Sequence, residues 1–459
     1  MIKNISLTST NKVFSANSGI ILYEEVWNQL KLDKRLRRLL PKKLKKRGVS
    51  QISKFKGILF SFALGNDCID DLQQLRSDDI FCYLIDGELP ARTAGDFLAN
   101  FQIRMIQKIQ DILLEMAIEL RLKSFIDPNF ILSMDSTPHK QSGKRMENLA
   151  MNYKGIWGFD SQNAYDQYGF TYLFDLRSGN THTSVDAENW IYKVFSKIPK
   201  HMNRYFRADS GYSNRAVFSS LIAAEAKFTI VLKDNIGKHV RSLNIDHLSW
   251  KKTNLIFFGS NECEVSMGLY PIKDLGSLRV VFLRRKKDEE EIIEQMELLE
   301  EYNPEEDDYR HYSIITNIDS SELDNVGIID FYRGRANCEN FIKEQKYNFD
   351  LLHFPCKKFE ANQAWGLIGS MAHNMTRFLS FQMEQKIKRV RDKKDGEIKT
   401  VTQRGYFAKK VRDEIIKIPC QVVRSARSVK VKLNNQKKEV LEKIMKNILE
   451  CFSKVTVFT

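Results

Sequence analysis

The sequence predicts an α/β protein built around a mixed sheet flanked by helices, and three observations support this class. Short apolar runs typical of strands alternate with segments of helical spacing between residues 126 and 238. Further strand-like runs fill 239–317. Long helical patterns come before and after these regions. Because 459 residues are too many for one ordinary core, we expect several domains.

The composition favours a polyanionic partner. The formal net charge is +14 and the isoelectric point is about 9.2, and a soluble protein with such an excess commonly binds nucleic acid. A membrane surface is the alternative, but no apolar run approaches the ~20 residues of a spanning helix. The N-terminus also lacks the apolar segment of a signal peptide. We therefore expect a cytoplasmic protein that makes no contact with membranes.

The first 125 residues read as helical, with helices expected at 52–64 and 101–122. Residues 34–47 carry nine Lys or Arg and no acid, interleaved with leucines. Two interpretations stay open for this run, a surface that contacts phosphates and a solvated charged face.

The strand pattern begins at 130–134, which is followed directly by Asp135. Further strands are expected at 168–176, 180–185, 204–208 and 228–232, and helices at 187–198 and 215–226. Asp209 follows the fourth of these strands. The resulting order β-β-β-α-β-α-β implies a mixed sheet with an aspartate after its first and fourth strands.

Residues 239–317 interrupt this alternation with strands expected at 255–258, 263–269, 278–283 and 312–316. Within this stretch, residues 288–308 contain twelve acids and no base, which argues against a direct contact with DNA there.

Helical spacing returns at 332–346 and 363–381. Residues 386–412 then carry eleven Lys or Arg against three acids. We interpret this basic segment as an arm that contacts DNA, and the alternative is a solvated tail.

The segment 332–346 places one acid among bases. At ~100° per residue, an unbroken helix puts the side chains of one set within a sector of roughly 80°. That set is Tyr332, Arg335, Glu339, Lys343 and Lys346. Glu344 falls on another side of the helix, so Glu339 is the carboxylate that shares a face with the cations. Considered alone, the segment also fits a solvated helix with ordinary charge pairs.

Asp135, Asp209 and Glu339 together suit a metal-dependent cleavage of phosphodiesters. That reaction needs charge compensation at the attacking and leaving oxygens, which two divalent ions about 3.5 to 4 Å apart supply. Mg²⁺ prefers hard oxygen ligands, so carboxylates at the ends of rigid elements suit it. Taken singly, each of these acids also fits a helix cap or a surface charge.

The spacing Tyr332-x2-Arg335-x3-Glu339-x6-Lys346 resembles the YREK signature of bacterial insertion-sequence transposases of the DDE type. Residues 207–212 resemble the block around the second acid in one branch of the insertion-sequence-four-like superfamily, its thirteen-eighty branch, and 177–182 resemble the block before it. Asp135-Ser136-Thr137 matches the first acidic motif. The sequence departs from that branch at 138–152, where a stretch rich in glycine and glutamine is usual.

The resemblance, which spans about residues 90–380, implies a ribonuclease H-like catalytic domain that binds two Mg²⁺ ions, with Mn²⁺ able to replace them. It implies that Asp135, Asp209 and Glu339 are the catalytic metal ligands. It further implies a homodimer that works on double-stranded DNA, both the transposon ends and the target, in the bacterial nucleoid. The residues expected to contact DNA are Tyr332, Arg335, Lys346, Lys343, Arg207 and Arg177. The implied regions are a helical DNA-binding region at 1–125, the catalytic domain at 126–238 and 318–385, a β-rich insertion at 239–317 and a basic region at 386–459.

The function expected from this resemblance is cleavage of the element's inverted ends and transfer of the 3′ hydroxyls to target DNA. Two alternatives stay open, a ribonuclease H-like DNA nuclease without strand transfer and a DNA-binding relative that no longer cuts. The intact acids argue against the second alternative. Trp157 and Trp250 are both candidates to stack on an extruded base, and a place in the core is the alternative for each.

Overall fold

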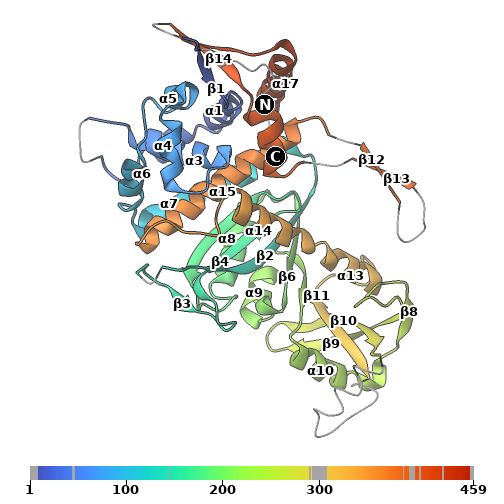
Figure 1. Ribbon diagram of the computed structural model, residues 1–459. Helices are drawn as coiled ribbons and strands as arrows, with labels where there is room; N and C mark the ends of the chain where they lie inside the picture. Colours follow the sequence, from blue (N-terminus) through green and yellow to red (C-terminus); the bar gives the residue numbers. More distant parts are fainter. Residues whose placement is uncertain are drawn as a thin grey trace, which may run out of the picture.

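The computed structural model describes residues 9–43, 47–143, 145–288, 291, 308–385, 387–391, 398–402, 405–425 and 428–454. A large mixed sheet occupies the middle of the molecule, with helices from both ends of the chain gathered beside it (Figure 1). The α/β class predicted from the sequence is confirmed. Among the described residues, no helix has the length and apolar character needed to cross a bilayer.

The large sheet has ten strands in the order β3-β4-β2-β6-β7-β11-β10-β9-β8, and β5 pairs with β4. The pairs β2–β6 and β6–β7 are parallel, and the other pairs are antiparallel. The strands are β2 Asn129–Lys140, β3 Ala150–Met151, β4 Trp157–Tyr165, β5 Thr171–Ser178, β6 Asn203–Ala208, β7 Lys227–Val231, β8 Lys251–Thr253, β9 Cys263–Ile272, β10 Gly276–Lys286 and β11 Tyr309–Thr316.

Strand β4 was missed by the sequence analysis, and the strand predicted at 180–185 is wrong because that segment is a chain of turns. Strand β4 carries four consecutive polar residues at 160–163, so no apolar run marks it. All four are buried, and several of their polar atoms bond to residues distant in sequence. For example, Asp160 pairs with Arg177, and the amide of Gln162 donates to the Thr183 carbonyl at 2.8 Å. A local pattern of hydrophobic residues cannot predict such a strand, because the hydrogen-bond partners that allow its polar residues to be buried are distant in sequence.

The strands expected in 239–317 continue the large sheet from β7, because β11 pairs with it antiparallel. The strand predicted at 255–258 is wrong: only an isolated bridge joins Phe257 to Ser260. Most of the acidic stretch 288–308 lies outside the described residues.

The N-terminal region is helical, as predicted. Its helices are α1 Ile20–Gln29, α2 Leu32–Leu36, α3 Gln51–Leu64, α4 Leu72–Leu75, α5 Asp79–Leu84, α6 Ala91–Leu98 and α7 Ile103–Ser124. Only the start of the basic run 34–47 is helical, because α2 ends before Pro41 and residues 44–46 lie outside the described part of the chain.

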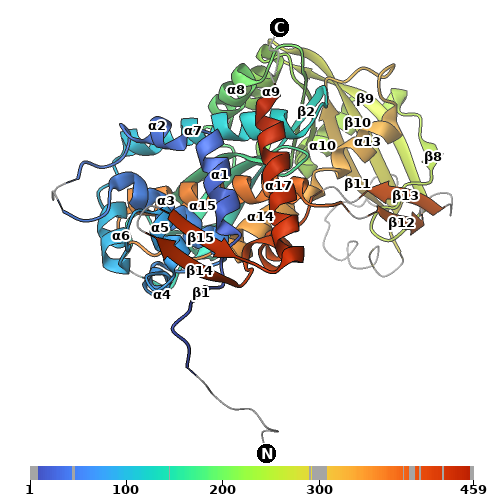
Figure 2. The same ribbon diagram turned by 90° about the horizontal axis from the view of Figure 1, so that it is seen from above.

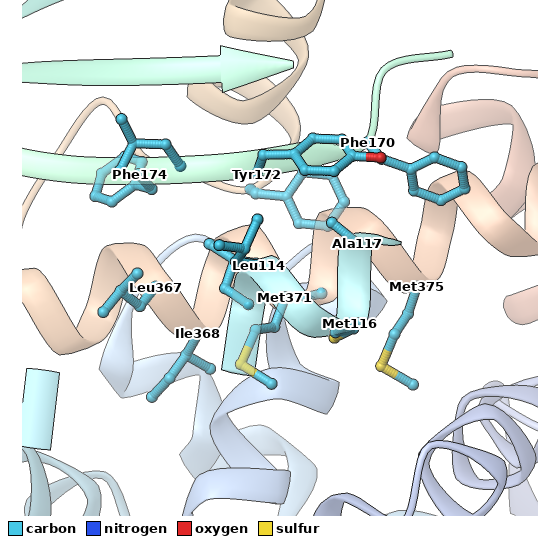
Figure 3. Close-up of a cluster of buried hydrophobic side chains, with 14 of the residues drawn as sticks. Leu114, Met116, Ala117, Phe170, Tyr172, Phe174, Leu367, Ile368, Met371 and Met375 are labelled. Carbon is cyan, nitrogen blue, oxygen red and sulfur yellow. The ribbon is translucent and has the colours of Figure 1, made fainter. Parts of the chain in front are cut away.

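The remaining helices are α8 Ala187–Lys197, α9 Arg215–Ala223, α10 Asp234–Leu243, α13 Asn325–Arg333, α14 Ala336–Asn348, α15 Phe359–Gln382, α16 Ala408–Val411 and α17 Asn435–Ser453. Helix α14 packs on β2 and β4, whereas α7 and α15 pack on β5. Figure 3 shows the second contact, where Phe174 and Tyr172 face Leu114, Leu367 and Met371.

The C-terminal region returns to the N-terminal helices. Strands β14 Cys420–Ser425 and β15 Ser428–Lys432 form a small sheet with β1 Val13–Ser15. Helix α17 lies beside α1 (Figure 2). A separate hairpin, β12 Ile387–Arg391 and β13 Ile398–Thr402, occupies part of the basic segment 386–412. One buried apolar cluster contains side chains of the N-terminal helices, the large sheet and α17, so regions far apart in sequence share a core.

A buried polar group links α14 to α15. His373 Nε2 lies 3.2 Å from the Glu344 carboxylate, and its Nδ1 lies 3.0 Å from the Thr171 hydroxyl. Burial lowers the pKa of His373, whereas hydrogen bonds from His373 and from the Ala408 amide outweigh the burial of Glu344 and lower its pKa. A neutral histidine that donates from Nε2 to an ionised glutamate satisfies both groups.

We predict that Gly366→Ala destabilises the protein by about 1 to 3 kcal/mol through overpacking. A Cβ at this position in α15 would lie 2.1 Å from Phe174 Cε1. The matched control is Gly95→Ala in α6, where a Cβ meets nothing within 4 Å, so the better helix propensity of alanine should be neutral or stabilising by up to about 1 kcal/mol. Thermal unfolding of both variants in one buffer tests this, and equal shifts would contradict it.

We also predict that His373→Asn flattens the dependence of stability on pH. The folded-state pKa of His373 lies below the unfolded value near 6.5, so the unfolded chain binds the additional proton and stability falls as pH drops below about 6.5. The slope attributable to one such group is at most about 1.4 kcal/mol per pH unit. Urea unfolding between about pH 7 and 5 measures it. The control is His247→Asn, which removes an exposed histidine outside this buried group. The flattening is expected for His373→Asn and not for this control.

Candidate active site

Parallel pairing of β2 with β6 brings two of the predicted acids to one place. Ser133 is paired with Arg207 at the end of the registered ladder, and Asp135 and Asp209 each stand two residues further on. Residues two apart in a strand share a face, and neighbouring strands lie about 4.8 Å apart. The two carboxylates are therefore neighbours. The prediction that the first strand ends at Asp135 is wrong, because β2 continues to Lys140 beside β4. Only its parallel pairing with β6 stops, at Ser133.

The turn after β6 fixes Asp209. Its Oδ1 accepts a hydrogen bond from the Gly211 amide at 3.0 Å and caps the short 3₁₀ helix Ser210–Tyr212. A Cβ at Gly211 would lie 2.9 Å from a Thr183 methyl group. The Thr183 hydroxyl in turn lies 3.0 Å from the hydroxyl of Ser136, next to Asp135. This chain of contacts joins the two acidic segments.

The single helix predicted over 332–346 is wrong, because α13 ends at Arg333 and α14 begins at Ala336. Glycine has a low helix propensity, and here it also permits a close approach. A Cβ at Gly334 would lie 2.1 Å from Arg207 Nη1. Despite the break, Arg335 Nε donates to the Tyr332 hydroxyl at 3.1 Å.

Arg335 connects the first acid to the third. Its Nη1 donates to Asp135 Oδ2 at 3.0 Å, and its Nη2 lies 3.4 Å from Glu339 Oε1. The side chain of Asp135 is 15% exposed and that of Glu339 is 52% exposed. The sequence analysis favoured phosphate binding over ion pairing for Arg335, but in the structure it is ion-paired with both acids. Glu344 is buried whereas Glu339 is exposed, so the two lie on different sides of α14, as the face argument predicted.

The electrostatics of the site centre on Asp135. Burial raises the pKa of Asp135 to about 6, the Arg335 guanidinium opposes that rise, and Asp209 adds to it. Interactions with Tyr332, Asp135 and Asp209 outweigh the burial of Arg335 and raise its pKa. The site therefore holds excess negative charge that one guanidinium only partly balances.

The other expected DNA-binding residues differ in exposure. Lys343 is exposed. Lys346 Nζ instead donates to the Thr137 hydroxyl at 2.6 Å and to the Pro138 carbonyl at 2.7 Å, and burial lowers its pKa to about 8. Tyr332 is buried, and burial raises its pKa. The contacts of these residues with DNA stay predictions.

Arg207 and Arg177 lie inside the protein. Arg207 donates to the Ser133 hydroxyl at 3.2 Å and to the Phe331 carbonyl at 3.1 Å. Arg177 pairs with Asp160 and donates to the carbonyls of the turns that follow β5. In this arrangement Arg207 holds β2 next to Asp135, whereas Arg177 ties β4 to the turns after β5. Their predicted contacts with DNA are likewise untested.

The donor set fits a hard divalent cation. Asp135 and Asp209 present carboxylate oxygens on rigid strand ends, and their mutual repulsion is relieved by a cation. The oxygens of Asp135, Asp209 and Glu339 do not all lie within 4.8 Å of one another. In the described part of the chain, one group of three possible ligands meets this 4.8 Å limit, and it consists of Asp67, Cys68 and Asp71 near the surface. Sequence patterns gave no signal for the Arg335–Asp135 pair, because 200 residues separate its partners.

No curated protein matches the chain. The family described as Transposase DDE domain group 1 matches residues 2–270 and 287–453. This match includes all three acids and most of the described fold, and such transposases act on DNA and generally use divalent metal ions. The chain therefore belongs to the DDE transposase family.

Proposed function

We propose that the protein binds the inverted ends of its own insertion sequence, cuts them and joins the freed 3′ hydroxyls to target DNA. Family membership supports DNA as the substrate. The observation that carries the proposal is the placement of Asp135 and Asp209 just beyond the last parallel pair of β2 and β6, with Arg335 reaching from Asp135 to Glu339. The excess of basic residues in the chain is consistent with binding long DNA.

We further propose a ribonuclease H-like catalytic domain at 126–238 and 318–385. The antiparallel run β5-β4-β2, followed by the parallel strands β6 and β7, supports it. Residues 239–317 are then an insertion that lengthens the sheet, and 1–125 and 386–459 are flanking regions for DNA. The YREK signature and membership of the thirteen-eighty branch belong to the same proposal.

Asp135, Asp209 and Glu339 would hold two Mg²⁺ ions, which Mn²⁺ can replace. Bound there, the ions would activate the attacking oxygen and stabilise the leaving oxygen. The exposed Glu339 side chain has room to turn toward the aspartates. Asp135 must be ionised to act as a ligand, and the Arg335 guanidinium favours that state.

Arg335 has a second role in this scheme. When Asp135 and Glu339 bind cations, the Arg335 guanidinium no longer pairs with them. Its N–H donors can then bind a phosphate through two hydrogen bonds. Tyr332 orients this fork through its hydroxyl, and Lys343 adds an exposed charge. Lys346 and Arg207 would act on DNA indirectly, through the part of β2 around Asp135 that they hold. Arg177 would act through the turns after β5 that it holds.

Two other functions compete with this one, a nuclease without strand transfer and a DNA-binding relative that does not cut. A strand-transfer assay distinguishes the three functions. In it, the protein is mixed with pre-cut ends that carry free 3′ hydroxyls and with circular target DNA. A transposase gives joined products, a nuclease gives only cuts, and a non-catalytic relative gives neither. Because two ends must be joined, we propose a homodimer on DNA, which sedimentation of the protein–DNA complex would detect.

We predict that Asp135→Asn and Asp209→Asn each lower cleavage and joining at least about 100-fold, because each removes a charged ligand without changing shape. The control is Asp246→Asn, an exposed carboxylate far along the chain from the site. It should cleave like the wild type. Retained cleavage by either site variant would refute the metal-ligand assignment.

We predict that Arg335→Ala binds Mn²⁺ more tightly than the wild type in the absence of DNA, because Arg335 and the metal ion compete for Asp135. Cleavage should nevertheless fall about 10- to 100-fold, since the phosphate contact is lost. Calorimetric titration with Mn²⁺ and a cleavage assay measure the two effects. Arg333→Ala, which removes a neighbouring arginine at the end of α13, is the control. Weaker binding of Mn²⁺ would show that Arg335 orients the acids instead of competing.

A further inference from the structure

The hairpin that joins β3 to β4 carries an exposed aromatic tip, which we define as residues 151–157. Met151 is 58% exposed, Tyr153 89% and Trp157 40%. Within the described chain, none of these three side chains packs against a buried apolar cluster. Figure 1 shows β3 at the margin of the molecule, beyond β4 and β2. Large apolar side chains gathered in this way on a soluble protein usually mark a binding surface.

Hydrogen bonds hold the tip in one shape. The Asn152 side-chain oxygen accepts from the amides of Lys154 and Ile156, both at 2.9 Å, and the Asn152 amide donates to the Ile156 carbonyl at 3.0 Å. Gly155 supplies the positive φ of +71° that this turn requires. The tip therefore presents its side chains without a large ordering cost on binding.

The base of the hairpin is fixed to the sheet by two close backbone approaches. A Cβ at Gly158 would lie 2.0 Å from the His139 carbonyl oxygen. A Cβ at Gly179 would lie 2.3 Å from the carbonyl oxygen of Ala150 and 2.4 Å from that of Gly158. Since β2 and the end of β5 both contact the hairpin, its position relative to Asp135 is set by the sheet.

The register relates the tip to the candidate active site. Asp135 pairs with Asn163 on β4, and Gln141, six residues beyond Asp135, donates its amide to the Trp157 carbonyl at 3.1 Å. Alternation along β4 places Trp157 on the same face of the sheet as Asp135. Six residues of strand span about 20 Å, which is about six base pairs of DNA at 3.4 Å each.

The structure also separates the two tryptophans that the sequence offered for stacking. The Arg284 guanidinium lies 3.9 Å from the ring centre of Trp250, whose other neighbours include His311. One face of the Trp250 ring is therefore covered by Arg284 and is not available to stack on a base. Trp157 pairs across the strands with Met151 and is open to solvent.

The charge around the tip suits a polyanion. Lys154 Nζ lies 5.4 Å from the ring centre of Tyr153, and Lys140 is exposed on the strand beside the hairpin. The nearby Glu147 carboxylate accepts a hydrogen bond from the Phe359 amide at 3.0 Å. Aromatic faces beside lysines are the combination that binds the bases and phosphates of a DNA strand.

From these observations we infer that the hairpin tip binds an unpaired DNA base about six base pairs from the cleavage position. Tyr153 and Trp157 supply the stacking surfaces, and Lys154 contacts the adjoining phosphate. This inference rests on the proposed function for the position of the DNA. The stacking itself requires no cleavage.

The test measures binding of a labelled single-stranded DNA to the full chain by fluorescence anisotropy, in EDTA and at several salt concentrations. Tyr153→Ala and Trp157→Ala should each weaken binding roughly 5- to 150-fold, the range of one stacked base. Their salt dependence should stay that of the wild type. Lys154→Ala should instead reduce the salt slope by about 1. Tyr153→Phe keeps the ring and should bind like the wild type.

The matched control is Tyr192→Ala on α8, a 59% exposed tyrosine outside the tip, which should not change binding. On duplexes with one unpaired base, tip-dependent binding should be strongest when that base lies about six base pairs from the cut. Wild-type binding by both alanine variants overturns the inference, and so does an equal loss in Tyr192→Ala. A change in self-association of the DNA-free protein without a change in DNA binding also overturns it, because the tip would then be a contact between copies of the chain.

These outcomes are distinct from those that test the proposed function. If wild-type protein cuts and joins its ends but the tip variants bind DNA normally, only the tip assignment fails. If binding depends on the tip but no end is cut, only the transposition proposal fails.

Discussion

Repulsion between two carboxylates is the constraint around which this structure is organised. Asp135 lies in β2 and Asp209 follows β6, and these two strands pair in parallel, so the sheet brings the two acids together whether or not a cation is present. Like charges at short range in a partly buried place are costly, and burial with this neighbour raises the pKa of Asp135. Arg335 offsets part of that cost in the structure.

The supporting contacts are directed at the same strand ends. Arg207 bonds to Ser133 at the last registered pair, and Lys346 bonds to β2 two residues beyond Asp135. Each removes freedom from the backbone that carries an acid. A site displaced by about 1 Å can lose about two orders of magnitude in rate, so under the proposed function these two cations would matter for catalysis by holding β2 still.

The break between α13 and α14 has a comparable purpose. Gly334 lets the chain pass close to Arg207, and the turn that results places Arg335 at the start of α14, within reach of both Asp135 and Glu339. A continuous helix would have kept the face of charges predicted from periodicity, and a side chain at position 334 would collide with the Arg207 guanidinium.

The sequence by itself determined the α/β class, most helices, and the choice of Asp135 and Asp209 as acids beside apolar strand segments, because these depend on local apolar periodicity and on residue types. Tertiary structure decided what local patterns do not encode. It made a buried strand of the polar segment 160–163 and paired Arg335 with Asp135 across 200 residues. It also covered Trp250 with Arg284 while leaving Trp157 open. In each case the partner that fixes the outcome is distant in sequence, so only the folded chain brings it into contact.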